Sequence, residues 1–170
     1  WIDLDAEKDP EGAERYLTEF SGFHGYGPMT RGVPSAIGNS GMISLTQWGC
    51  REEDDTDLVY NLAQWLDENH DRYKDAHPSL VATTRETTMK IAEYDFTPLH
   101  DGTVKYLTEL GLWTDAHESR RQYNIDLIQR YMDAYETAID LADEKGISVN
   151  PTNEEWIALW DNTKKDLPEV

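Results

Sequence analysis

The chain has 170 residues, and its 34 Asp and Glu residues outnumber its 15 Lys and Arg residues, giving a net charge of −19. This balance repels phosphate groups and therefore argues against nucleic acids and anionic membrane surfaces as partners. Hydrophobic residues make up 38% of the chain, which is enough to form a core. A membrane span needs about 20 apolar residues in a row, and no stretch approaches this length, so we predict a soluble protein. Trp1 is not an initiator methionine, so we also expect a part of a longer protein.

The N-terminal part predicts a short strand, one helix and a long loop. Residues 1–4 alternate in polarity like a strand, and Asp9 before Pro10 marks the start of a helix that Gly22 ends. The stretch 21–41 is rich in glycine and contains two prolines, which excludes a long regular element. Its glycines fit no phosphate-binding pattern. A loop of this length is consistent with a structural crossover and equally with the wall of a ligand cleft.

The next part predicts a strand and a long helix. Residues 42–48 alternate in polarity, which indicates a strand with one face better buried than the other. Asp55 or Thr56 can cap a helix that runs to about Lys74. We expect this helix to bury one stripe, formed by Leu58, Leu62, Leu66, His70 and Tyr73.

After the break at His77-Pro78, we expect residues 79–82 to be extended. Thr83 with Glu86 three residues later has the spacing of a capping box, and it predicts a threonine-rich helix to about Glu93.

The stretch from Tyr94 to Thr114 predicts a short, docked helix. Pro98 keeps the preceding residue extended, Asp101 can cap a helix over residues 102–110, and Gly111 can end it. The apolar residues Val104, Leu107 and Leu110 would form the buried face, and Lys105 and Glu109 would form an ion pair on the other side.

Two groups of residues carry a family resemblance. Asp57-Leu58-Val59-Tyr60, Asn69 and His77-Pro78 form the first group, and Pro98-Leu99-His100, Gly102, Tyr106-Leu107, Gly111 and Trp113 form the second. Together they resemble the C-terminal part of substrate-binding receptors of tripartite periplasmic (TRAP) transporters, in the TAXI subfamily. The resemblance covers roughly residues 57–113, about a third of the chain.

The resemblance implies a helix-rich α/β fold: the C-terminal lobe and packing helices of a two-lobed, type II periplasmic-binding-protein-like protein. Residues 1–113 would then be a lobe that includes the glycine-rich loop 21–41. It also implies a periplasmic receptor that binds a small organic anion, such as an amino acid or a carboxylate, and that contacts the TRAP membrane subunits. It implies no enzymatic activity and no cofactor.

The C-terminal part, residues 114–170, predicts one long helix, or two in line, followed by a final helix. Residues 114–145 would span about 48 Å as a helix before Gly146 stops it, which exceeds a single small core. We therefore expect the long helix to pack across lobes or against a partner. Thr152 with Glu155 has the capping-box spacing for the final helix, which carries Trp156, Leu159 and Trp160.

The candidate ligand contacts come from the glycine-rich loop. Its polar and aromatic residues His24, Tyr26, Asn39 and Ser40 are our prediction for the wall of an interlobe cleft. The alternative from another class is a helical interaction module, in which the helix over residues 114–145 mediates self-association into a homo-oligomer.

A third interpretation is a metal phosphohydrolase of the HD type. It would use His70, the pair His100-Asp101 and Asp140. His100-Asp101 lies at a helix start, however, where capping explains the aspartate, and the five histidines lack the close spacing of a zinc site. Cys50 is the single cysteine, which excludes a disulfide within the chain, and it has no spacing-defined base. We therefore predict neither catalytic nor metal-binding residues.

The acidic residues are spread along the chain in ones and twos, as on an ordinary acidic surface or on one adapted to high salt. If the surface is adapted to salt, screening of the net charge of −19 should raise the free energy of unfolding between low and molar sodium chloride. Urea titrations followed by circular dichroism measure this quantity. An unfolding free energy that is indifferent to salt would exclude the adaptation.

Overall fold

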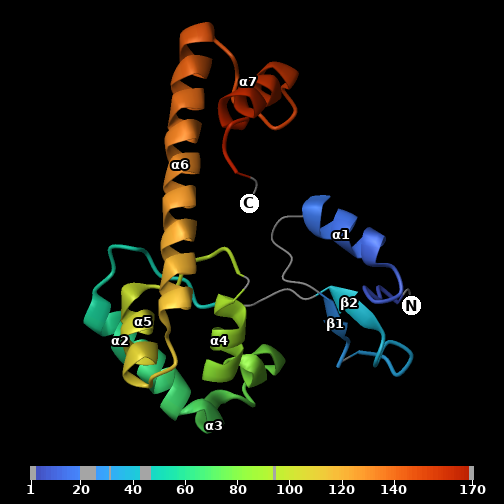
Figure 1. Cartoon of the computed structure of the whole chain (residues 1–170), viewed down its shortest axis with the longest axis vertical. Helices are drawn as coiled ribbons and strands as arrows, with labels where there is room; N and C mark the ends of the chain where they lie inside the picture. The colour runs from blue at the N-terminus through green and yellow to red at the C-terminus, as the bar shows by residue number, and fades with distance from the viewer. Residues whose placement is uncertain (1–2, 20–25, 31, 43–46, 94, 169–170) are drawn as a thin grey trace. The chain divides into compact units, whose positions relative to one another are not determined.

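The computed structural model describes residues 3–19, 26–30, 32–42, 47–93 and 95–168. It divides into two compact units, residues 1–114 and residues 115–170 (Figure 1). The described residues are mostly helical, with one two-stranded sheet, which agrees with the helix-rich character that we predicted. Among these residues, no helix combines the length and the apolar character that a membrane crossing requires.

The first helix, α1 (Pro10–Glu19), begins where the sequence predicted. The Asp9 carboxylate accepts a hydrogen bond from the Gly12 amide at 2.9 Å and so caps the helix. Residue 22, the predicted end signal, lies outside the described residues.

The described part of the glycine-rich stretch is a β-hairpin. Strands β1 (Tyr26–Pro28) and β2 (Ser40–Met42) pair antiparallel, with Tyr26 opposite Met42 and Pro28 opposite Ser40. The intervening loop is closed by a backbone bond of 2.8 Å from the Met29 amide to the Asn39 carbonyl. In the described part of this stretch the strands are short, as its glycines and prolines require.

Two predicted strands are not strands in the described residues. Leu4 has no strand geometry, although its amide donates to the Ser40 carbonyl at 3.0 Å. Of residues 42–48, only Met42 lies in a strand, residues 43–46 are outside the described part, and Gln47 and Trp48 are irregular. The side-chain amide of Gln47 donates to the buried Asp95 carboxylate at 2.7 Å. Alternating polarity alone does not make a strand, because a strand also needs a partner for its backbone groups.

The long predicted helix over residues 56–74 is broken in two. Helix α2 (Thr56–Glu68) is capped by Asp55, whose carboxylate accepts from the Leu58 amide at 2.8 Å, and α3 (His70–Tyr73) follows. The break is at Asn69, whose side-chain amide donates to the Trp65 carbonyl at 3.0 Å. Asparagine side chains compete for backbone partners in this way and so end helices.

The predicted buried stripe is wrong in its N-terminal part, whereas Leu66, His70 and Tyr73 are half-buried. Leu58 and Leu62 are 64% and 46% exposed, whereas Val59, one position along, is only 7% exposed. The reason is tertiary: α2 packs on α5 (Asp101–Glu109) through the face that contains Val59.

The residues before α4 (Arg85–Ala92) also differ from the prediction. Residues 79–82 are not extended but belong to a short 3-10 helix, Pro78–Ala82, whose Ser79 amide donates to the His77 ring at 3.2 Å. Helix α4 is capped by Thr84 rather than Thr83, because the Thr84 hydroxyl accepts from the Thr87 amide at 3.2 Å.

Helix α5 is capped by His100 rather than Asp101. The Nδ1 atom of His100 accepts from the Gly102 amide at 3.0 Å, and Asp101 becomes the first helical residue. Gly111 ends the helix as predicted, with a φ of +71° that favours glycine. Of the predicted buried face, Leu107 is buried as expected, Val104 is half-buried and Leu110 is exposed; Tyr106, which was not predicted, completes the buried face.

The predicted ion pair on α5 is also wrong. Lys105 does not pair with Glu109 but bonds Asp57 of α2 at 2.9 Å. Glu109 instead accepts from the Tyr60 hydroxyl at 2.6 Å. Both side chains thus bridge between helices.

The second unit is a helical hairpin. Helix α6 (Asp115–Lys145) is one continuous helix that ends at Gly146, whose φ is +64°, and α7 (Glu154–Lys164) lies beside its C-terminal part (Figure 1). The core of the hairpin contains Ala138, Ala142 and Trp156. The cap of α7 is Asn153 rather than Thr152, because the Asn153 side chain accepts from the Glu155 amide at 3.0 Å.

The α2–α5 contact depends on a glycine. A Cβ atom on Gly102 would clash with the Thr56 carbonyl oxygen and would lie 2.6 Å from the Tyr60 amide nitrogen, both on the backbone of α2. Helix propensity alone predicts that Gly102→Ala stabilises the chain, by up to about 1 kcal/mol. We expect the reverse, a loss of about 2–3 kcal/mol in the free energy of unfolding, because α5 must move away from α2.

Urea denaturation followed by circular dichroism measures this change. Gly49→Ala is the matched control, since a Cβ atom at Gly49 meets nothing within 4 Å, and it should change the free energy by less than about 0.5 kcal/mol. A neutral or stabilising Gly102→Ala would contradict the close packing of α2 on α5.

Candidate functional site

A polar cluster joins three helices of the first unit. The Asp67 carboxylate of α2 accepts from the Tyr106 hydroxyl of α5 at 2.7 Å. Its other oxygen lies 3.1 Å from Nε of Arg85, the first residue of α4. One carboxylate therefore receives a neutral donor from one helix and a charged donor from another, which satisfies a largely buried charge.

Tyr106 is the buried member of this cluster. Burial, followed by the hydrogen bond to Asp67, raises the pKa of Tyr106 to about 12. The phenol is therefore a neutral donor throughout the physiological range and does not act as an acid or a base there. Its chemical role is to hold the Asp67 carboxylate in place.

A second, exposed cluster lies along the same two helices. The Tyr60 and Tyr106 rings meet edge to face, with centroids 5.8 Å apart. The Lys105 ammonium lies 4.9 Å from the centre of the Tyr60 ring. The hydrogen bond to Glu109 is the main cause that raises the pKa of Tyr60, and the bond to Asp57 likewise raises that of Lys105. Exposed pairs of this kind add little stability each, but they fix the register of α5 on α2.

Among the predicted ligand contacts, Tyr26 anchors the hairpin. Its hydroxyl donates to the Ala13 carbonyl of α1 at 3.3 Å, and its ring lies 6.1 Å from that of Tyr16. Burial raises the pKa of Tyr26. The hydroxyl thus already bonds the backbone of α1, and the residue joins the helix to the strand.

Asn39 and Ser40 lie at the other end of the hairpin ladder. The side-chain amide of Asn39 donates to the Ser35 carbonyl at 3.1 Å, and the backbone amide of Ser40 donates to the Asp3 carboxylate at 2.7 Å. The structure therefore brings Tyr26, Asn39 and Ser40 into one hairpin, although Tyr26 and Ser40 do not face each other across the ladder. His24 lies outside the described residues.

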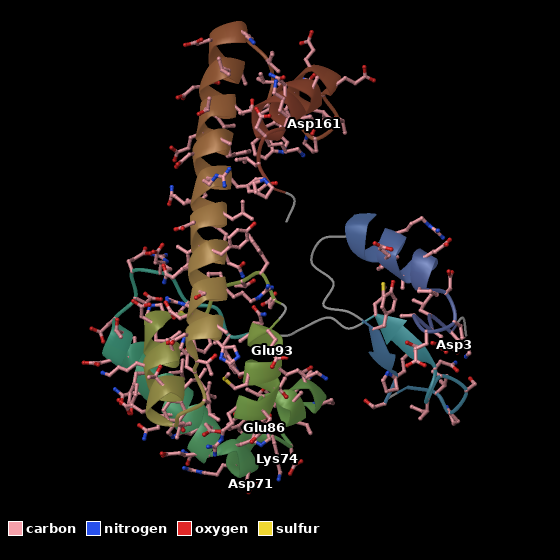
Figure 2. All side chains as sticks on the ribbon, in the orientation of Figure 1. Asp3, Asp71, Lys74, Glu86, Glu93 and Asp161 are labelled. Atoms are coloured by element: carbon pink, nitrogen blue, oxygen red, sulfur yellow. The ribbon has the colours of Figure 1, made fainter. Side chains whose placement is uncertain are left out.

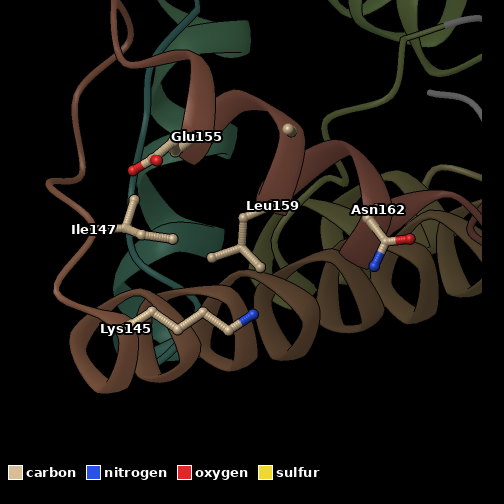
Figure 3. Close-up of a pocket in the computed structure, with 6 residues that line it drawn as sticks. Lys145, Ile147, Glu155, Leu159 and Asn162 are labelled. Atoms are coloured by element: carbon tan, nitrogen blue, oxygen red, sulfur yellow. The ribbon is translucent and has the colours of Figure 1, made fainter.

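A shallow depression lies between α7 and the end of α6 (Figure 3). It has a volume of about 520 Å³ and is wide open to solvent. Its floor is apolar and its rim polar; the lining residues are Lys145, Ile147, Glu155, Ala158, Leu159 and Asn162. Small-molecule sites usually bury most of their ligand. This depression is too open to do so, and it is therefore not a good candidate for a small-molecule site.

The histidines of the HD-type alternative bond backbone groups. His100 uses Nδ1 for the Gly102 amide and Nε2 for the Glu52 carbonyl, at 3.0 and 3.1 Å. Nε2 of His70 lies 2.9 Å from the Leu80 carbonyl. Within the part of the chain that the structure describes, no group of three or more His, Cys, Asp or Glu side chains is placed to hold a metal ion.

The cluster around Asp67 was missed at the level of sequence. A usable signal existed, because Asp67 follows Tyr60 by seven residues and so lies on the same side of α2, which packs on α5. The predicted buried stripe, which runs through Leu58 and Leu62, did not include that side.

Comparison with known proteins supports the resemblance to periplasmic binding proteins, but not the assignment to the TAXI subfamily of TRAP receptors. Residues 43–111 match the model of the NMT1-like family, a periplasmic binding-protein-like family. The match includes the first motif group and, except for Trp113, the second, and with them the α2–α5 pair. It suggests a solute-binding function for this part of the chain. No curated protein and no solved structure matches the chain significantly.

The Tyr106–Asp67 bond makes stability depend on pH at the alkaline end. Tyr106→Phe removes one donor to Asp67 and should cost about 1.5 kcal/mol at neutral pH. The pKa of a tyrosine is about 10 in the unfolded chain and about 12 for Tyr106 in the folded chain. The protonated hydroxyl therefore contributes its full stabilisation of the fold below about pH 10. That contribution is lost as the pH rises towards 12. The unfolding free energy of the wild type should therefore fall more steeply over this window than that of Tyr106→Phe.

Urea titrations at several pH values test this prediction, and Tyr123→Phe is the control because its side chain is 55% exposed. Parallel pH curves for the wild type and Tyr106→Phe would show that the hydroxyl is not bonded as described.

Proposed function

We propose that the chain is part of an extracytoplasmic solute-binding receptor of a TRAP-type secondary transporter, of the TAXI subfamily. The observation that carries this proposal is the match of residues 43–111 to a periplasmic binding-protein-like family. The motifs that begin at Asp57 and Pro98 lie inside that segment, except for Trp113, and they resemble the TAXI receptors.

The proposed receptor has two lobes of a type II fold, and the solute lies between them. Backbone amides and a few polar side chains hold the solute, and closure about a hinge presents the complex to the TRAP membrane subunits. Hinge closure requires lobes that move as rigid bodies. Two contacts make the α2–α5 pair rigid: the close approach of Gly102 to the α2 backbone and the hydrogen bond between Tyr106 and Asp67.

The proposed solute is a small organic anion, an amino acid or a carboxylate. A net charge of −19 does not oppose this, because loop amides and helix N-termini set the local field at a binding site. The proposed contacts are His24, Tyr26, Asn39 and Ser40. The bond from Tyr26 to α1 and the bond from Asn39 to Ser35 hold the described three in fixed positions, as a preorganised site needs.

The proposed location is the periplasm, and the proposed role includes neither catalysis nor a cofactor. Partial burial and the Asp54 charge raise the pKa of Cys50, which lowers its thiolate fraction and so disfavours a nucleophilic role.

A second candidate is self-association into a homo-oligomer through α6. The observation that favours it is the exposure of large side chains along this 31-residue helix: Met132 is 54% exposed and Tyr123 is 55% exposed. Such side chains gain burial when two copies meet.

Isothermal titration of the full-length native protein with a panel of amino acids and small carboxylates tests both candidates. We expect one panel member to bind, and Tyr26→Ala combined with Ser40→Ala to weaken it at least tenfold, because two cleft contacts are lost. The matched control combines Tyr123→Ala and Ser119→Ala, the same residue types in the other unit, and should leave the affinity unchanged.

Unchanged affinity in the Tyr26/Ser40 variant would remove these residues from the site. Absence of any solute response, together with a concentration-dependent oligomer in light scattering, would favour self-association through α6 instead.

A further inference from the structure

Helix α2 carries a second apolar face that is not covered within its unit. Leu58, Leu62 and Trp65 follow one another at intervals of four and three residues, so they lie on one side of the helix. They are 64%, 46% and 46% exposed, respectively. We call these three residues the outer face of α2. It lies away from Val59, which is buried towards α5.

The outer face cannot turn inward. Helix α2 is fixed on its other side by the close approach of Gly102, by the Asp67–Tyr106 bond at 2.7 Å and by the Asp57–Lys105 pair at 2.9 Å. Any rotation that buried Leu58 and Leu62 would break these contacts. The exposure of the outer face is therefore a property of the packed helix pair.

The aromatic residue of the outer face is held in position. The Trp65 ring stacks on Tyr73 of α3, with centroids 6.0 Å apart and planes inclined by 16°. The Arg72 guanidinium lies 6.0 Å from the centre of the same ring and also donates to the Asn69 side chain at 3.0 Å. A rigid, half-exposed tryptophan loses little conformational entropy on binding, which is typical of interface anchors.

The charges around the outer face are mainly negative. Asp55 lies three residues before Leu58, and Glu68 lies three residues after Trp65. Asp54 and Asp57 add two more carboxylates at the N-terminal end, where Lys105 is already paired with Asp57. At the other end, Lys74 pairs with Asp71 (Figure 2), which leaves Arg72 over the Trp65 ring.

We propose that the outer face of α2 is a docking site for a cationic amphipathic helix of a partner protein. The partner helix would place apolar residues at intervals of three and four on Leu58, Leu62 and Trp65. Its Lys and Arg residues would face the carboxylates that flank this face. A second copy of this chain is disfavoured as the occupant because each copy carries a net charge of −19. This inference does not depend on the proposed solute.

A synthetic 18-residue helical peptide tests the site directly. It carries leucines at positions i, i+4 and i+7 of one face and lysines beside them, and a fluorescent label reports its binding to the full chain by anisotropy. We expect saturable one-to-one binding that weakens with added salt. A companion peptide with glutamates in place of the lysines should bind at least tenfold more weakly.

Variants of the chain separate docking from unspecific attraction of a cation to an acidic protein. Leu58→Ser combined with Leu62→Ser should weaken binding of the lysine peptide at least tenfold. The matched control combines Val33→Ser and Ile37→Ser, two other exposed apolar residues, and should bind like the wild type. Glu68→Lys reverses a flanking charge, at the cost of the exposed hydrogen bond from the Gln64 side chain, and leaves the apolar residues in place. It should also weaken binding, which keeps the test valid if the double serine variant does not fold.

Three results would overturn the proposal. The first is absence of binding, and the second is equal binding of the lysine peptide to the wild type and to both outer-face variants. The third is a homodimer that Leu58→Ser with Leu62→Ser abolishes, because a second copy would then be the occupant. Sedimentation equilibrium of the wild type and of this variant distinguishes that last case.

Discussion

The contact between α2 and α5 at Gly102 is the constraint on which the described helical part of the first unit depends. A helix can approach the backbone of another this closely only where one of them lacks a Cβ atom, and here the missing atom would meet the Thr56 carbonyl and the Tyr60 amide. This approach brings the Tyr106 hydroxyl within hydrogen-bonding distance of Asp67. The buried carboxylate is thus a consequence of the glycine contact, and Arg85 completes its hydrogen bonds.

That contact also decides which face of α2 meets the solvent. The helix has apolar residues on two sides, and only one side can lie against α5. Because Val59 takes the covered side, Leu58 and Leu62 remain exposed. An apolar face that is rigid, flanked by carboxylates and uncovered differs from scattered surface leucines, which occur on most proteins. This difference is the basis for assigning it to a cationic partner helix.

The hairpin and the helix pair contribute differently to the proposed receptor. The hairpin residues Tyr26 and Asn39 are positioned by side-chain bonds to neighbouring backbone carbonyls. The helix pair is closely packed and its buried polar groups are satisfied by Tyr106 and Arg85. Binding proteins commonly combine polar loops that contact a ligand with a rigid scaffold that positions them. The acidic surface repels phosphates, and by itself it does not define a site; the carboxylates beside the outer face of α2 matter because they flank an exposed apolar face.

The sequence by itself determined most helix positions and several ends, because caps and glycine stops act within a few residues. Asp55 and the glycines 111 and 146 were predicted in these roles and occupy them. The sequence did not determine the buried face of α2, the cap of α5 or the partner of Lys105. Each of these depends on which helix lies beside which, and several choices satisfied the local pattern. Tertiary structure decided among them through one steric fact, the close approach that Gly102 permits.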